Sequence, residues 1–165
     1  MTVTIRPLSL GDVTDDYVAW MQDPVVTRDL VSGLRPQTRD TIEAFVRSLA
    51  WPSAAAFAVC LDGRHVGNVN LRAIDWIHRH AEVGILIGDR TVWHRGVAST
   101  AVILVIRYAR FLGLRRLWAG TCGEPARDFF LHLGWSLEGV QRQHMRINGA
   151  WRDHYLFGLQ IEREG

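Results

Sequence analysis

The helix expected over residues 99–112 is the sequence feature that most constrains the fold. Ser99–Leu112 is apolar almost all round until Arg107, its first charged residue. A helix of this kind is largely buried, so other elements have to cover it on several sides. Apolar segments of strand type lie on both sides of it in the chain, Ala81–Ile87 before and Leu117–Cys122 after. We therefore expect an α/β domain in which this helix packs against a sheet.

The remainder of the chain alternates between strand-like and helix-like segments. Val3 and Ile5 alternate with polar residues as in a strand. Two amphipathic helices follow, the first capped by Ser9 and ending near Pro24, the second capped by Thr38. The later expected elements are the strands Phe57–Leu61, Arg64–Ile74, Ala81–Ile87 and Leu117–Cys122, the helices Ser99–Leu112 and Pro125–Leu133, and the hairpin strands Val140–Ile147 and Trp151–Gln160. This order predicts a single domain over residues 1–165, with a mixed, mostly antiparallel seven-stranded sheet flanked by four helices.

Composition limits the classes of protein to consider. The 165 residues are 48% hydrophobic and 22% charged, which is typical of a globular domain and excludes a disordered chain. The formal net charge is +2 and no run of five basic residues occurs, so we expect no nucleic-acid partner. No apolar run approaches the roughly 20 residues of a membrane span, and two cysteines are too few for a disulfide framework. We expect a cytoplasmic protein without a membrane partner, either a monomer or a homodimer.

The turn before the buried helix is a candidate anion site. It carries Gly96 and Ala98 two residues apart, between the strand Ala81–Ile87 and the helix. The first N–H groups of a helix lack partners within the helix and favour an anion. The turn could hold a pyrophosphate, although many strand–helix turns contain glycine and a plain structural turn is an equal alternative.

The same region resembles the central strand and pyrophosphate loop of the GNAT-superfamily acetyltransferases. The matching run extends from Ala81 to Asp89 and continues as Trp93-His94-Arg95-Gly96-Val97-Ala98. The family loop reads Gln/Arg-x-x-Gly-x-Gly/Ala, so Gly96 and Ala98 match and Trp93 departs from it. That departure is common in the branch of ribosomal-protein N-terminal and amino-sugar acetyltransferases.

A second segment is similar to the family downstream of the loop. The family pattern is Asn-x-x-Ala-x-x-x-Tyr-x-x-x-Gly-Phe, and here Ala126 and Gly134 match it in register. Gly123 replaces the asparagine and Phe130 replaces the tyrosine, which in many relatives protonates the departing thiolate. The resemblance covers about residues 3–160 and implies the GNAT fold.

The resemblance implies acetyl-CoA as cosubstrate, held between two splayed central strands, and no metal. Pantetheine would pair with one strand and the pyrophosphate would lie on the loop amides. The implied cofactor-binding residues are Ile85, Leu86, Ile87, Arg95, Gly96, Val97, Ala98, Ser99 and Phe130.

Glu82 is the candidate catalytic residue. An alkylammonium has a pKa near 10, so it must lose a proton before its nitrogen can attack a thioester. A carboxylate beside the amine, or reached through water, can accept that proton. The alternative is a half-exposed glutamate on a strand, paired with an arginine.

Four residues are candidates for binding the acceptor: Trp20, Asp75, Trp76 and His78. The tryptophans could stack on a sugar or a base, or could simply pack, and the Asp75–His78 segment could be a solvated loop. His78-Arg79-His80 has metal-ligand spacing, but no third ligand is evident from sequence.

The predicted reaction is acetyl transfer from acetyl-CoA to a primary amine of a small molecule, with a nucleotide-linked amino sugar as the expected acceptor. A protein N-terminus is the main alternative substrate, and other small amines such as antibiotics or polyamines stay open. A non-catalytic acyl-CoA-binding module is the alternative function, suggested by the missing tyrosine and asparagine.

Overall fold

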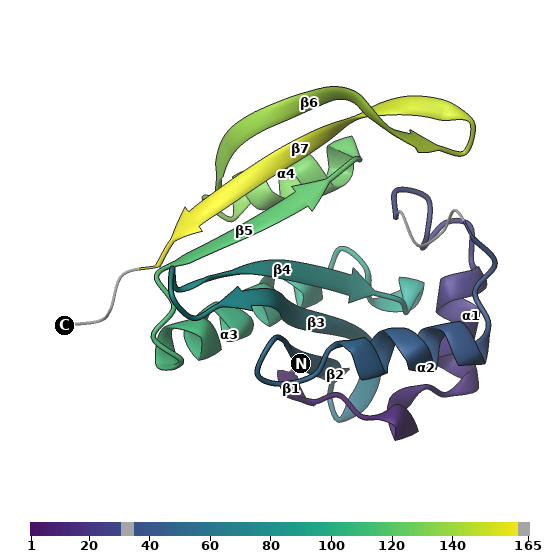
Figure 1. Cartoon of the computed structure of the whole chain (residues 1–165). Coiled ribbons are helices and arrows are strands. Elements are labelled where there is room, and N and C mark those ends of the chain that lie inside the picture. The colour runs from purple at the N-terminus through teal and green to yellow at the C-terminus, as the bar shows by residue number, and fades with distance from the viewer. Residues whose placement is uncertain (31–34, 162–165) are drawn as a thin grey trace.

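A computed structural model describes residues 1–30 and 35–161. Its seven strands form one sheet in the order β1-β2-β3-β4-β5-β7-β6 (Figure 1). The strands are β1 Val3–Pro7, β2 Ala55–Leu61, β3 Arg64–Asp75, β4 His80–Ile87, β5 Arg116–Thr121, β6 Ser136–Ile147 and β7 Ala150–Gln160. Every neighbouring pair is antiparallel except β4 and β5, which are parallel. The predicted mixed, mostly antiparallel seven-stranded sheet is confirmed.

Four α-helices accompany the sheet: α1 Asp15–Gln22, α2 Arg39–Ser48, α3 Val97–Phe111 and α4 Glu124–His132. The N-cap expected at Thr38 is confirmed, since its hydroxyl accepts a hydrogen bond from the Thr41 N–H at 3.2 Å. The cap expected at Ser9 was wrong for α1, which is capped by Thr14. Ser9 instead opens a separate 3₁₀ turn, η1 Leu10–Asp12.

Asp12 causes this early break in the chain. Its carboxylate accepts hydrogen bonds from the Ser9 N–H at 2.9 Å and from the Arg6 guanidinium at 2.7 Å. These bonds close one turn against β1, so the backbone leaves the helical path before α1 begins.

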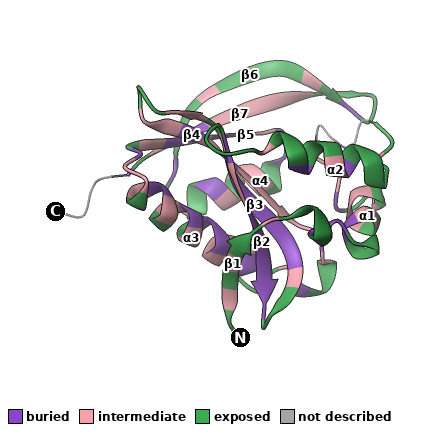
Figure 2. Cartoon of the chain, turned by 60° about the horizontal axis from the view of Figure 1, so that its bottom comes forward, coloured by how far each residue is buried: buried purple, intermediate pink, exposed green. Residues whose placement is uncertain are grey.

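The α3 helix packs against β1, β3 and β4, and Ala101, Val102, Val105 and Ala109 are buried along it. Its burial is less complete than its composition suggests, because Ile103 and Phe111 are 44% and 84% exposed. Figure 2 shows that β2 and β3 lie in the buried centre, whereas β6 is largely exposed. No helix within residues 1–30 and 35–161 is long and apolar enough to cross a membrane.

Asp12→Asn is expected to lower the free energy of unfolding at pH 7 by about 1–2 kcal/mol, because it weakens a charge-assisted hydrogen bond. The Arg6 guanidinium lowers the pKa of Asp12 from 3.8 to about 2. A carboxyl whose folded pKa is depressed stabilises the fold above its unfolded pKa and loses that effect as the pH falls toward the folded value. The stability difference between wild type and variant, measured by urea unfolding, should therefore shrink between pH 4 and pH 2. Equal stability at pH 7 would contradict this role for Asp12.

Candidate active site

The sheet opens between its two central strands. Parallel pairing of β4 with β5 is limited to His80–Arg116, Ala81–Leu117 and Glu82–Trp118. Beyond these three pairs the strands diverge (Figure 1), while β4 stays paired with β3 on its other side as far as Ile87. Along residues 83–87, the edge of β4 that faces the opening therefore has no hydrogen bonds to β5. An extended ligand could pair with this free edge as an added strand.

The loop after β4 ends at the N-terminus of α3. A 3₁₀ turn, η3 Arg90–Val92, starts the loop, and the indole of Trp93 donates a hydrogen bond at 2.8 Å to the carbonyl of Ile87. Trp93, which departs from the family motif, thus ties the loop to the end of β4.

Gly96 has a φ of 78° and precedes the first turn of α3. A Cβ at this position would meet no atom within 4 Å, so the space above the loop is open. The amides of Val97, Ala98 and Ser99 belong to the first helical turn, where N–H groups have no helical partner. An N-terminus with open space before it can hold an anionic group such as a pyrophosphate.

Glu82 lies on the sheet face opposite α3, at the last paired position before the opening. Its carboxylate accepts a hydrogen bond from Nη2 of Arg72 at 2.7 Å and is 18% exposed. If Glu82 has only a structural role, Arg72 is the arginine with which it was expected to pair. Asn70, two residues earlier on β3, is 7% exposed, and its Oδ1 has no hydrogen-bond partner among the described residues. The face beside Glu82 is thus polar and partly shielded from water.

Phe130 lies in the core rather than along the opening. It is 4% exposed and packs against Trp135 and Phe157, with ring centroids 5.0 and 5.4 Å away. Its placement favours a packing role, and the predicted cofactor contact stays a prediction.

The four predicted acceptor residues do not meet in one place. The indole of Trp20 lies against the α carbon of Gly88, beyond the carboxyl end of β4. Trp76 lies in the turn before the amino end of β4 and packs edge-to-face against Trp51, with ring centroids 5.4 Å apart. The eight steps along the strand from His80 to Gly88 span roughly 26 Å at strand spacing. Trp20 and Trp76 therefore lie near opposite ends of β4, too far apart to line one small-molecule pocket.

Asp75, His78 and His80 form a cluster at that turn. Their candidate ligand atoms lie within 4.8 Å of one another, and the His78 Nδ1 is 3.0 Å from an Asp75 oxygen. The backbone N–H of His78 is the main cause that lowers the pKa of Asp75 to about 2. Two imidazoles and a carboxylate are a donor set that suits divalent transition metals. The contacts within the cluster also account for it as a structural turn, and the absence of a metal stays a prediction.

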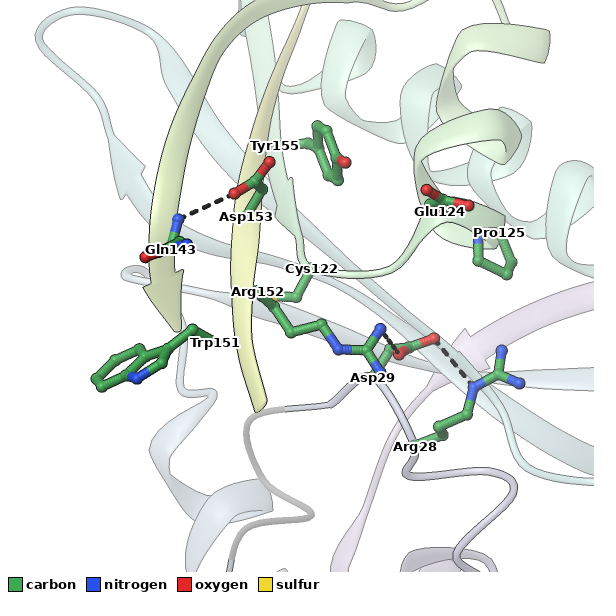
Figure 3. Close-up of a pocket in the computed structure, with 10 residues that line it drawn as sticks. All are labelled: Arg28, Asp29, Cys122, Glu124, Pro125, Gln143, Trp151, Arg152, Asp153 and Tyr155. Atoms are coloured by element: carbon green, nitrogen blue, oxygen red, sulfur yellow. Dashed lines mark hydrogen bonds and ion pairs between the residues drawn. The ribbon is translucent and has the colours of Figure 1, made fainter. Parts of the chain in front are cut away.

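A pocket of about 550 Å³ lies near the carboxyl end of β5 (Figure 3). It is lined by Arg28, Asp29, Cys122, Glu124, Pro125, Gln143, Trp151, Arg152, Asp153 and Tyr155. Asp29 bridges two arginines of the lining, because its carboxylate oxygens lie 3.3 Å from the Arg28 guanidinium and 3.5 Å from that of Arg152. Burial, followed by the charge of Asp29, raises the pKa of Cys122, which keeps this thiol protonated.

Sequence reasoning did not predict this pocket. Its lining comes from the segment after α1, the β5–α4 junction and the β6–β7 hairpin, which are far apart in the chain. Strand and helix periodicity gives no indication of which loops meet.

Comparison with known proteins gives the context of this geometry. Residues 2–124 match the family described as an acetyltransferase (GNAT) domain. The chain is 33% identical over 102 residues to the uncharacterized N-acetyltransferase YoaA of Bacillus subtilis, covering 60% of this chain and 57% of that protein. It is 29% identical over 162 residues to the spermidine N(1)-acetyltransferase of Escherichia coli K12, covering 92% of this chain and 82% of that protein.

The fold agrees with these matches. The structure of RimL, a ribosomal L7/L12 alpha-N-protein acetyltransferase in complex with coenzyme A, superposes with a TM-score of 0.87, although the sequences are 17% identical. The superposition covers 99% of this chain and 97% of that one. The matched sequence includes both the opening between β4 and β5 and the loop that leads into α3. The chain therefore belongs to the GNAT family of acetyltransferases.

Proposed function

We propose that this protein transfers the acetyl group of acetyl-CoA to a primary amine of a small molecule. The observation that carries the proposal is the opening between β4 and β5, which ends at the N-terminus of α3 in a chain of the GNAT family. Pantetheine would pair with the free edge of β4 at Ile85, Leu86 and Ile87. The pyrophosphate would accept hydrogen bonds from the amides of residues 95–99.

The residues around the opening have separate tasks in this mechanism. Glu82 is the general base, which draws the proton from the ammonium before attack. The free amine nitrogen then attacks the thioester carbonyl, and a backbone N–H near Leu86 stabilises the negative charge on its oxygen. Arg72 holds the Glu82 carboxylate toward this side of the sheet.

The 550 Å³ pocket is the proposed acceptor site. For the nucleotide-linked amino sugar expected from sequence, Arg28 and Arg152 offer charges for a diphosphate, and Trp151 offers a stacking surface. A polyamine is the second candidate, because Glu124 and Asp153 add carboxylates to the lining and a spermidine acetyltransferase is among the relatives. The protein N-terminus remains an alternative, consistent with the fold shared with the L7/L12 enzyme.

A release assay for free thiol would test the function. Acetyl-CoA is incubated with amino-sugar nucleotides, polyamines, aminoglycosides and N-terminal peptides, and products are identified by mass. We expect catalytic thiol release and an acetylated amine with a member of the first two classes. Acetyl-CoA binding without turnover on any amine would favour a non-catalytic acyl-CoA-binding module.

Phe130→Tyr is expected to change kcat by less than about tenfold. A thiol has a pKa near 8.5, so a thiolate at pH 7 lies only about 2 kcal/mol above the thiol, and acid catalysis is not essential for its departure. Water, Cys122 or Tyr155 can supply the proton in place of a tyrosine at position 130. Steady-state kinetics at saturating acetyl-CoA check this, and a hundredfold increase in kcat would show that the missing hydroxyl limits the wild-type enzyme.

A further inference from the structure

His154 of β7 lies beside the opening, on the same sheet face as Glu82. Glu82 and Trp118 are paired neighbours, and Gly120 follows Trp118 by two residues, so all three positions share a face. A Cβ on Gly120 would stand 2.6 Å from Nε2 of His154. The imidazole therefore covers β5 two residues beyond the last β4–β5 pair, and glycine at position 120 is what allows it to lie there.

The hydrogen bonds of His154 determine which ring nitrogen is available. Its Nδ1 is 2.8 Å from Oε1 of Gln141 on β6. An amide oxygen only accepts hydrogen bonds, so Nδ1 carries the hydrogen and donates it. In the neutral ring Nε2 then keeps its lone pair, and this is the nitrogen that faces Gly120.

Burial, more than the neighbouring charges, favours the neutral form of this ring. Burial is the main cause that lowers the pKa of His154 below 6.5, followed by the charge of His144, whose ring is stacked on it at 5.7 Å. Glu82 of β4 acts in the opposite direction and favours the imidazolium. On β5 the ring lies over Gly120, and on β6 it contacts the uncharged Gln141 as well as His144. In the part of the chain that the structure describes, Nε2 has no hydrogen-bond partner, so at pH 7 the neutral ring can accept a proton there.

We propose that Nε2 of His154 accepts the proton of the acceptor ammonium and that Glu82 stabilises the imidazolium that forms. This inference rests on the proposed acetyl transfer and changes one step of it. His154 takes the proton in place of Glu82, whose carboxylate is already engaged by Arg72. The assignment explains why β5 carries a glycine beneath the ring and why Nδ1 is held by Gln141.

Acetyl transfer removes two protons from the acceptor nitrogen. One N–H bond of the ammonium breaks and its proton moves to Nε2. The nitrogen lone pair forms a C–N bond with the thioester carbonyl carbon, and the C–S bond breaks with its electron pair on sulfur. A second proton from the nitrogen reaches the thiolate, and His154 releases its proton to water. The products are the amide, the thiol and one proton.

His154→Gln tests the proposal by its pH profile. We expect kcat/KM for the amine to fall about thirtyfold or more at pH 7 and to rise with pH with a log–log slope near one, because only the neutral amine then reacts. The wild type should be nearly flat between pH 7 and pH 9. His132→Gln, an exposed histidine at the end of α4, is the matched control and should stay within twofold of wild type. A wild-type profile in His154→Gln would overturn the proposal.

A double variant shows whether Glu82 and His154 act on the same proton or act independently. If His154 and Glu82 act on one proton, the Glu82→Gln/His154→Gln enzyme should be no slower than the slower single variant, within about threefold. Losses that multiply would contradict the coupling. Gly120→Ala, which displaces the ring without removing a functional group, should also lower kcat/KM at pH 7 if His154→Gln is poorly folded.

Titration of the imidazole by NMR provides a readout independent of turnover. The pKa of His154 should fall in Glu82→Gln and rise in His144→Gln, and an unchanged value in Glu82→Gln would refute the electrostatic link. If the wild type binds acetyl-CoA but acetylates no amine, the proposed function is wrong. If the enzyme is active and His154→Gln does not change its kinetics, only this inference is wrong.

Discussion

Glu82→Gln is expected to lower kcat/KM at neutral pH about a hundredfold. Deprotonating an ammonium of pKa near 10 costs about 4 kcal/mol at pH 7, and the variant loses the carboxylate that helps to draw off this proton. Glutamine keeps an oxygen within reach of Arg72, so the strand pairing should survive. Raising the pH should partly restore the rate, because solution then delivers the neutral amine. Steady-state kinetics between pH 6 and pH 9 measure both effects.

Glu138→Gln is a matched control for this variant. Glu138 on β6 also pairs with an arginine, since Nη1 of Arg116 donates to it at 2.7 Å, but it lies at the paired end of β5 rather than in the opening. Its kcat/KM should stay within about threefold of wild type. Full activity of Glu82→Gln across pH 6–9 would remove Glu82 from the mechanism.

Gly96→Val is expected to weaken acetyl-CoA binding tenfold or more. A φ of 78° is unfavourable for a β-branched residue, so the loop would shift and its amides would no longer converge on one anion. The new side chain would also occupy the open space above the loop. Calorimetric titration with acetyl-CoA measures the change.

Gly134→Val supplies the control for backbone strain alone. Gly134 has a φ of +83° and similar open space, and it follows α4, which runs back from the carboxyl end of β5. It therefore lies at the opposite end of the sheet from Gly96. This variant should lose comparable stability while it binds acetyl-CoA as wild type does. Unchanged affinity in a folded Gly96→Val protein would rule out the pyrophosphate placement.

The order of elements was predictable because it depends on local periodicity. The alternation of polar and apolar residues in β4 predicted that Glu82 and Val83 lie on opposite faces of the sheet. In the structure Val83 is buried and Glu82 lies on the other face. The break before α1 was not predictable, because it depends on the contact between Asp12 and Arg6 across a turn.

The candidate site was predictable only where it is continuous in sequence. The loop through Gly96 could be found because strand, turn and helix follow one another. Arg152 and Asp29 meet across 123 positions, so the pocket they share depends on tertiary packing. His154 could be assigned to a strand from its neighbours, but its position over Gly120 depends on how β7 pairs with β5.

Amide hydrogen exchange with and without coenzyme A locates the cosubstrate on the protein. If the cosubstrate adds along β4 and its pyrophosphate sits on the loop, protection should increase at residues 85–87 and 97–99. The β1–β2 edge, which takes no part in the proposed site, should exchange unchanged. Protection confined to regions outside the β4 edge and the α3 N-terminus would show that coenzyme A binds elsewhere, against the proposed acetyl-CoA site.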